Sequence, residues 1–375
     1  MAQGFLPEHD PLEALPKSFA PWEKVAKYLP KLLLSEHFRA TVEALPDFTT
    51  TQLATQAEIE RAMQLLSYLG HAYIWGVKPI PTTLPKVLAK PWYEVAKKLD
   101  RPPVLSYASY ALQNWKRLDP TGPITLGNIA LIQNFLGGVD EEWFILVHVN
   151  IEAVATDALQ ASIDAIKAVQ QKNCKAVIVA IEALRDSLEK MCQVLDRMPE
   201  RCDPYIYYNR VRPYIHGWKG HPAFPEGLIY EGVEEYEGKP QQFRGETGAQ
   251  SSIIPSLDGL LGISHSEDQL YHYLQEMRLY MPPKDREFVA SIERESRVRD
   301  YVKEKMHEHP ALKERYNDCI LLINRFRQTH LGYAATYIQK QHQMSEGNPT
   351  AVGTGGTPFM QYLKKHKDET STFLL

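Results

Sequence analysis

The chain has 375 residues, of which 44% are hydrophobic and 23% charged, and its formal net charge is −4. This size suffices for one large core or two unequal domains. The absence of a general basic field argues against nucleic acid as a partner. No apolar run approaches the roughly 20 residues that a membrane span needs, and the start of the chain lacks the regions of a signal peptide. We therefore expect a soluble, cytoplasmic protein that uses no membrane.

The first part of the chain predicts a small helical domain, which we place at residues 1–103. Helical periodicity and proline positions set the expected boundaries. The segment Gly76–Pro91 is rich in proline and cannot be one regular element. The helices expected here are Trp22–Leu34, Glu36–Leu45, Thr50–Leu69 and Pro91–Leu99.

The remainder, residues 104–375, predicts a larger helical domain. Two glycine-rich segments, Gly217–Gly248 and Ser345–Thr357, interrupt it, and loops of this length inside a domain are usually functional. Because no alternating strand pattern extends beyond a few residues, we expect an all-α fold. The helices expected here are Val104–Leu112, Thr125–Phe135, Trp143–Gln171, Lys175–Met198, Asp203–Ile215, Ser252–Leu261, Glu267–Tyr280, Lys284–Ser291, Ser296–Lys305, Leu312–His342 and Pro358–Lys367.

His330 lies on an apolar stripe of the helix expected over Leu312–His342. One interpretation is a core imidazole that is hydrogen-bonded to a carbonyl or a buried water. The other is an axial ligand that a rigid helix presents to a metal or haem iron, with Arg327 one turn earlier as a possible propionate partner. Periodicity alone favours the first. The residues that share this helical face are Tyr316, Ile320, Ile323, His330, Ala334 and Tyr337.

A second histidine, His148, interrupts the apolar run Trp143–Val149. An unpaired polar group is costly to bury, so His148 is either a satisfied core residue or a group that faces a bound ligand. The loop Gly353–Thr357 precedes a helix and is either an anion-binding nest or a flexible connector. Because the four cysteines form no CxxC pair, a zinc–thiolate site is not predicted.

Eight short stretches carry a more specific signal as a set. They are Pro103–Ala108, Ile215–Gly220, Gly227–Gly232, Gly248–Ser252, Leu257–Ile263, Met277–Pro283, Gln328–Leu331 and Gly353–Thr357. In this order they resemble the indoleamine 2,3-dioxygenase family of haem proteins. The resemblance covers most of the chain from about residue 100 onward and is far less distinct before it.

The resemblance implies that the large domain binds haem b, which is active in the ferrous state. His330 would be the proximal iron ligand, and Asp258 matches the residue that orients its imidazole. Thr247 and Gly248 match residues beside the haem edge. Together with Arg327 they form the expected cofactor site.

The resemblance also implies a binding site for L-tryptophan or a related indoleamine. Arg212 matches the residue that binds the tryptophan carboxylate, and Tyr207 matches an aromatic substrate contact. The other expected substrate-binding residues are Tyr107 and Phe144 around the indole, and Thr354 and Gly355 in a loop over the amino acid moiety.

Two positions depart from the better-known animal members of the family. His148 falls where those members carry Ser or Thr, and a one-residue slip would place Val147 there instead. The sister family, tryptophan 2,3-dioxygenase, has a distal histidine that contacts the indole N–H, so we assign a catalytic role to His148. Glu246 introduces a charge where the family usually has a small residue, which could alter the pocket entrance.

The function expected from this resemblance is insertion of both atoms of O2 across the indole C2–C3 bond, giving N-formylkynurenine. This is the first step of kynurenine-type tryptophan catabolism and requires a reductant, whose identity the sequence does not reveal. The alternatives are a non-enzymatic, myoglobin-like O2-binding haem protein and a helical module without a cofactor. A monomeric state is compatible with the sequence.

Overall fold

The computed structural model describes residues 3–344, 353–354 and 359–375. Over these residues the regular secondary structure is almost entirely helical, which confirms the all-α prediction. The strands are two residues long: β1 (Thr83–Leu84) pairs in parallel with β4 (Ile229–Tyr230), and β2 (Lys116–Arg117) pairs antiparallel with β3 (Ile129–Ala130). None of the described helices combines the length and apolar character that crossing a membrane requires.

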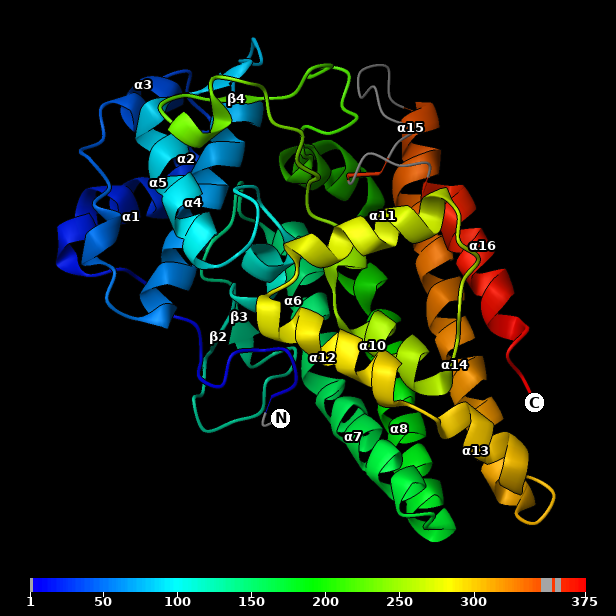
Figure 1. Cartoon of the computed structure of the whole chain (residues 1–375). Coiled ribbons are helices and arrows are strands. Elements are labelled where there is room, and N and C mark those ends of the chain that lie inside the picture. Colours follow the sequence, from blue (N-terminus) through cyan, green and yellow to red (C-terminus); the bar gives the residue numbers. More distant parts are fainter. Residues whose placement is uncertain (1–2, 345–352, 355–358) are drawn as a thin grey trace.

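The N-terminal helices lie together on one side of the molecule, in blue to cyan in Figure 1. The longest of them, α4, begins with a capping box in which Thr55 and Glu58 satisfy each other's backbone N–H groups. His71 ties α4 to two distant segments, because its Nδ1 donates to the Tyr214 carbonyl at 2.7 Å and its Nε2 accepts from the Leu105 N–H at 2.9 Å. These helices are α1 (Ala20–Lys27), α2 (Leu29–Leu32), α3 (Phe38–Glu43), α4 (Gln56–Trp75) and α5 (Lys86–Lys98).

The other helices form the larger part of the molecule (Figure 1). The helix α14 packs against both α8 and α16, and α7 packs along α8. The helices are α6 (Val139–Val154), α7 (Thr156–Gln170), α8 (Cys174–Leu195), α9 (Pro204–Ile206), α10 (Ile253–Leu261), α11 (Gln269–Met277), α12 (Pro283–Glu295), α13 (Val298–Lys305), α14 (Pro310–Ala334), α15 (Lys340–Met344) and α16 (Phe359–Ser371).

Short 3-10 and π-helical segments join these helices. The 3-10 segments are η1 (Lys17–Phe19), η2 (Thr50–Gln52), η4 (Met198–Glu200), η6 (Arg212–Ile215), η7 (Glu234–Tyr236), η8 (Gly248–Gln250) and η9 (Arg278–Tyr280). The π-helical segments are η3 (Ala108–Leu112), η5 (Tyr207–Val211) and η10 (Ala335–Gln339). Single π-helical turns are rare and often occur at functional sites.

The helix predicted over Trp143–Gln171 is wrong in one respect, because the chain breaks at Ala155 into α6 and α7. The cause is a hydroxyl from α8. Ser187 Oγ donates to the Val154 carbonyl at 2.7 Å and accepts from the Ala158 N–H at 3.2 Å. It therefore stands between the two backbone groups that would bond each other in a continuous helix.

The helix predicted over Thr125–Phe135 is also wrong, since this segment is irregular apart from β3. Asparagine side chains take up its backbone donors. The Leu126 N–H donates to Asn150 Oδ1 at 3.3 Å, and the Gln133 N–H donates to Asn114 Oδ1 at 2.8 Å. These acceptors lie 24 and 19 positions away in the sequence, so tertiary contacts satisfy the donors that a helix would have used.

Candidate active site

A cavity of about 710 Å³ opens among α6, α8, α10, α11, α14 and α16. Its volume lies within the range of about 300–1,000 Å³ that is typical of small-molecule sites. Part of its wall is apolar and comes from Met191, Leu195, Ile254 and Phe326. The polar groups that reach it come from several elements, as a binding site requires.

His330 lies in the last turns of α14 and faces this cavity. Unlike the other members of its predicted stripe, which are buried, His330 is exposed and its imidazole lines the cavity, where the surrounding protein atoms still desolvate the ring. Burial and the neighbouring His148 lower the pKa of His330 to about 4. The ring is therefore neutral at pH 7, which is the form that binds a metal. Among the described residues it makes no hydrogen bond.

His148 faces the same cavity from α6, whereas Val147 is fully buried away from it. Its Nδ1 lies 2.7 Å from the carbonyl oxygen of Phe144. Because a carbonyl only accepts, Nδ1 carries the proton and Nε2 presents a lone pair. Burial lowers the pKa of His148, which keeps the ring neutral. The site thus holds two neutral imidazoles on two separate helices.

Aromatic rings form the cavity wall around His148. The rings of Phe144 and Tyr207 lie 4.6 Å apart, and those of Phe144 and His148 lie 4.7 Å apart. Tyr107 is held from two sides, since its hydroxyl donates to Glu152 Oε1 at 2.9 Å and its N–H donates to Gln250 Oε1 at 2.9 Å. Tyr107, Phe144 and Tyr207, all expected in the substrate site, are therefore brought together.

Asp258 and Arg327 form a buried ion pair at the cavity wall, with 2.5 Å between Arg327 Nη2 and Asp258 Oδ2. Burial raises the pKa of Asp258, but the combined effect of Arg327 and His265 is larger and in the other direction. The pKa of Asp258 therefore lies below its ordinary value. We expected Asp258 to orient the imidazole of His330. No hydrogen bond joins these two side chains in the described structure, and Asp258 acts on α14 through Arg327.

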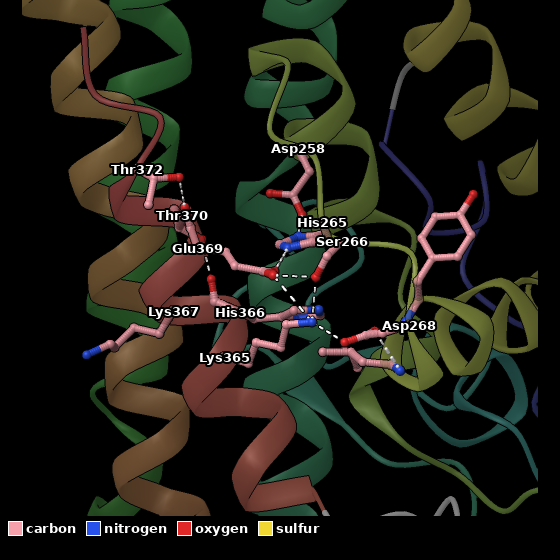
Figure 2. A network of polar contacts seen from close by, with 12 residues as sticks. Asp258, His265, Ser266, Asp268, Lys365, His366, Lys367, Glu369, Thr370 and Thr372 are labelled. Atoms are coloured by element: carbon pink, nitrogen blue, oxygen red, sulfur yellow. Dashed lines mark hydrogen bonds and ion pairs between the residues drawn. The ribbon is translucent and has the colours of Figure 1, made fainter.

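The network continues from Asp258 to α16, as Figure 2 shows. His265 places Nε2 3.5 Å from Asp258 Oδ2 and Nδ1 2.6 Å from Glu369 Oε2. Burial opposes a charge on His265, but the two carboxylates outweigh it and raise its pKa. Arg327 also donates to the hydroxyl of Thr370 in α16. The network therefore fastens α10 and α14 to α16.

His265, His366 and Glu369 could also hold a metal ion, because their ligand atoms lie within 4.8 Å of one another. Sequence reasoning missed this cluster, whose members come from two segments about a hundred positions apart without a motif. His265 and Glu369 already satisfy each other, and Lys365 Nζ lies 3.4 Å from Glu369. A neighbouring cation disfavours a bound cation. We therefore interpret the cluster as part of the ion-pair network.

The other expected site residues fall into three groups. Thr247, Gly248 and Thr354 line the cavity. Arg212 is fully buried, with its guanidinium 5.4 Å from the centre of the Tyr208 ring, but it is not part of the cavity wall. Gly355 lies outside the described residues.

Comparison with known proteins places the chain in a family. The family model described as indoleamine 2,3-dioxygenase matches residues 1–373. The chain belongs to the indoleamine 2,3-dioxygenase family. Its members are oxidoreductases, so the predicted enzyme class is confirmed. The match also includes the first hundred residues, where the sequence alone gave a weak resemblance.

Named relatives cover nearly the full length of the chain. Indoleamine 2,3-dioxygenase 1 of Rattus norvegicus is 40% identical over 99% of this chain and 93% of its own length. The indoleamine 2,3-dioxygenase of Saccharomyces cerevisiae is 33% identical over 98% of this chain and 90% of its own. A 6-hydroxytryptophan 2,3-dioxygenase of Fusarium equiseti is 30% identical over 97% of this chain and 93% of its own. Relatives in this family thus carry names with different indole substrates.

Proposed function

We propose that this protein is a haem-dependent dioxygenase that opens the indole C2–C3 bond of L-tryptophan or a related indoleamine with O2, giving N-formylkynurenine. The observation that carries the proposal is the pair His148 and His330. Two neutral imidazoles from separate helices face one cavity of about 710 Å³ in a chain of this family. His330 would ligate the iron, and His148 would contact the substrate.

The residues at the cavity fit a haem group. His330 offers a neutral nitrogen without a hydrogen bond in the described structure, and the apolar wall suits a flat macrocycle. A Cβ added at Gly248 would meet nothing within 4 Å, so this part of the wall leaves room beside the cavity. Arg278 and Arg327 also line the cavity, where they pair with Glu293 and Asp258 and would bring positive charge near the propionate groups. When bound, haem would supply the ferrous iron that activates O2.

The distal residues would hold and orient the indole. The rings of Phe144 and Tyr207 offer apolar faces, and the fixed Tyr107 closes the wall beside them. The lone pair on His148 Nε2 can accept the indole N–H, which would set the orientation of the C2–C3 bond. His148 need not remove the proton, because attack by indole C3 can precede loss of the N–H proton. Holding the reactants in one geometry supplies much of the rate enhancement in such sites.

The carboxylate of an amino acid substrate would be bound near Arg212. This arginine is fully buried, and its charge acts on Tyr207, whose ring lines the cavity. Thr354 lies at the cavity and donates from Oγ1 to the Glu246 carbonyl at 2.5 Å. A hydroxyl at the cavity wall and a buried arginine behind Tyr207 support an amino acid site, which an oxygen carrier would not need.

The deciding experiment mixes the reduced, haem-loaded protein with L-tryptophan and O2 and follows the absorbance of N-formylkynurenine. We expect continuous product formation while a chemical reductant keeps the protein active. A stable oxygenated complex without product would overturn the proposal and favour the oxygen-binding alternative. Repeating the assay with hydroxylated tryptophans determines the substrate range, which the name of the Fusarium equiseti relative makes worth testing.

A further inference from the structure

The carboxyl group of Glu246 differs from the other buried carboxyl groups near the site. Glu141 accepts three backbone N–H groups, from Phe135, Leu136 and Gly137. Glu152 accepts the hydroxyls of Tyr107 and Ser251. Glu246 is only 4% exposed and lines the cavity, yet its carboxyl group makes no hydrogen bond or ion pair within the described residues.

The backbone around Glu246 fixes where this carboxyl group lies. The Glu246 N–H donates to the Ile215 carbonyl at 3.0 Å, and its own carbonyl accepts from Thr354 Oγ1 at 2.5 Å. The preceding Gly245 packs so closely that a Cβ there would lie 2.2 Å from the Gly217 nitrogen. The segment therefore cannot shift to carry the side chain to another partner. Glu246 stays at the cavity beside Thr354.

A buried carboxylate without a partner is unfavourable, and a ligand of opposite charge removes the penalty. We propose that the Glu246 carboxylate binds the ammonium group of the substrate, so that this enzyme selects indoleamines by their positive charge. The inference rests on the proposed function, because it assigns one more contact in the same site. It also gives a role to the charge that replaces a small residue of the family.

The charge state of Glu246 supports this assignment. Burial raises its pKa to about 8, so the free carboxyl group is mostly protonated at pH 7. Its charge contributes to the raised pKa values of four neighbouring tyrosines, which stay protonated and neutral. His148 and His330 in the cavity are neutral as well. The two arginines of the cavity lining, Arg278 and Arg327, pair with Glu293 and Asp258 and not with Glu246. The tyrosines are Tyr68, Tyr107, Tyr110 and Tyr207.

An ammonium that binds here must drive the Glu246 proton off. At pH 7, binding should release between about half a proton and one proton per ligand, given a pKa near 8 in the free protein. The test uses two tryptophan analogues, each of which keeps one of the two charged groups of the amino acid. Tryptamine has the ammonium and lacks the carboxylate, and indole-3-propionate has the carboxylate and lacks the ammonium. Calorimetric titration of the haem-loaded protein in buffers of different ionisation enthalpy measures both affinity and proton release.

We expect the wild-type protein to release a proton with tryptamine and none with indole-3-propionate. Glu246→Gln keeps the shape and removes the charge. It should weaken tryptamine binding by about 10- to 100-fold, abolish the proton release and leave indole-3-propionate binding within a factor of about two. Glu226→Gln, at an exposed glutamate, is the matched control and should change nothing. The wild-type proton release is informative even if the variant folds poorly.

Equal losses of affinity for both ligands in Glu246→Gln, or no proton release with tryptamine in the wild type, would overturn the inference. The proposed function would stand in that case, provided that the wild-type protein still converts L-tryptophan. A wild-type protein that converts no indole substrate would instead overturn the proposed function, and the ammonium site with it. L-Tryptophan turnover by the wild type is therefore measured in the same preparation.

Discussion

Polar groups on one wall of the cavity are paired with one another, whereas some polar groups on the other wall have no such partners. On the wall of α10, α14 and α16, charged side chains pair with one another, from Arg327 and Asp258 to His265 and Glu369. In the part of the lining outside these three helices, which we call the second wall, His148 Nε2 and the Glu246 carboxyl group make no contact of this kind within the described residues. The first wall is held by its own contacts and can carry a cofactor rigidly. The second keeps its donors and acceptors for a ligand.

The largest effect should come from substituting His330, because it is a polar side chain of the first wall that makes no hydrogen bond within the described residues. His330→Ala removes the proposed iron ligand, and we expect haem affinity to fall by about 100-fold or more, beyond the effect of losing a group that only supports a ligand. Haem content and the Soret absorbance of the purified protein measure the loss. His307→Ala, at an exposed histidine, is the control. Wild-type haem content in His330→Ala would show that another residue holds the iron.

The ion pair of the first wall should affect folding stability rather than haem binding. Asp258→Asn leaves the Arg327 guanidinium buried without its carboxylate, and removing one partner of such a pair costs about 3–5 kcal/mol of folding free energy. We expect a loss near the lower end of this range, because the Asp258 side chain is 12% exposed. Urea unfolding at pH 7 measures the change, and Asp47→Asn at an exposed position is the control.

The pH dependence of this pair has a definite sign. Because the folded protein lowers the pKa of Asp258, its contribution to stability is present above the ordinary aspartate pKa of about 4 and is lost as the pH falls through the lower, folded value. The stability difference between the wild type and Asp258→Asn should therefore shrink in acid. A difference that stays constant down to pH 3, or a stability loss below 1 kcal/mol at pH 7, would contradict a structural role for the pair.

The sequence predicts the first wall better than the second, for physical reasons. The stripe from Tyr316 to Tyr337 follows the helical period, so the burial of Arg327 and the direction of His330 could be read from spacing. The contact between His265 and Glu369 could not, because 104 positions separate them and no period links them. The break that Ser187 makes between α6 and α7 likewise depends on packing of a third helix.

The environment of the Glu246 carboxyl group could not be predicted from the sequence. A departure from the family's small residue was visible in the sequence, and it suggested a change at the pocket entrance. The lack of any partner for its carboxyl group is a property of the folded site, because the equally buried Glu141 and Glu152 each accept hydrogen bonds there. Only the three-dimensional arrangement separates a structural carboxyl group from one that faces a ligand.

The smallest of the expected effects concerns His148, whose Nε2 faces the cavity while Nδ1 is held by the Phe144 carbonyl. His148→Leu keeps the bulk and removes the acceptor for the indole N–H. Because one neutral hydrogen bond contributes about 0.5–1.5 kcal/mol, kcat/KM for L-tryptophan should fall by about 3- to 10-fold. His37→Leu, at an exposed histidine, serves as the control.

A substrate without the donor separates this hydrogen bond from a change in cavity shape. L-Tryptophan methylated at the indole nitrogen cannot donate to Nε2, so the wild-type protein should prefer L-tryptophan and His148→Leu should lose that preference. If His148→Leu lowers kcat/KM for both substrates by the same factor, His148 acts by filling space, and the acceptor assigned to the second wall is not used. If the preference disappears, the hydrogen bond to the indole N–H is the part of His148 that the reaction needs.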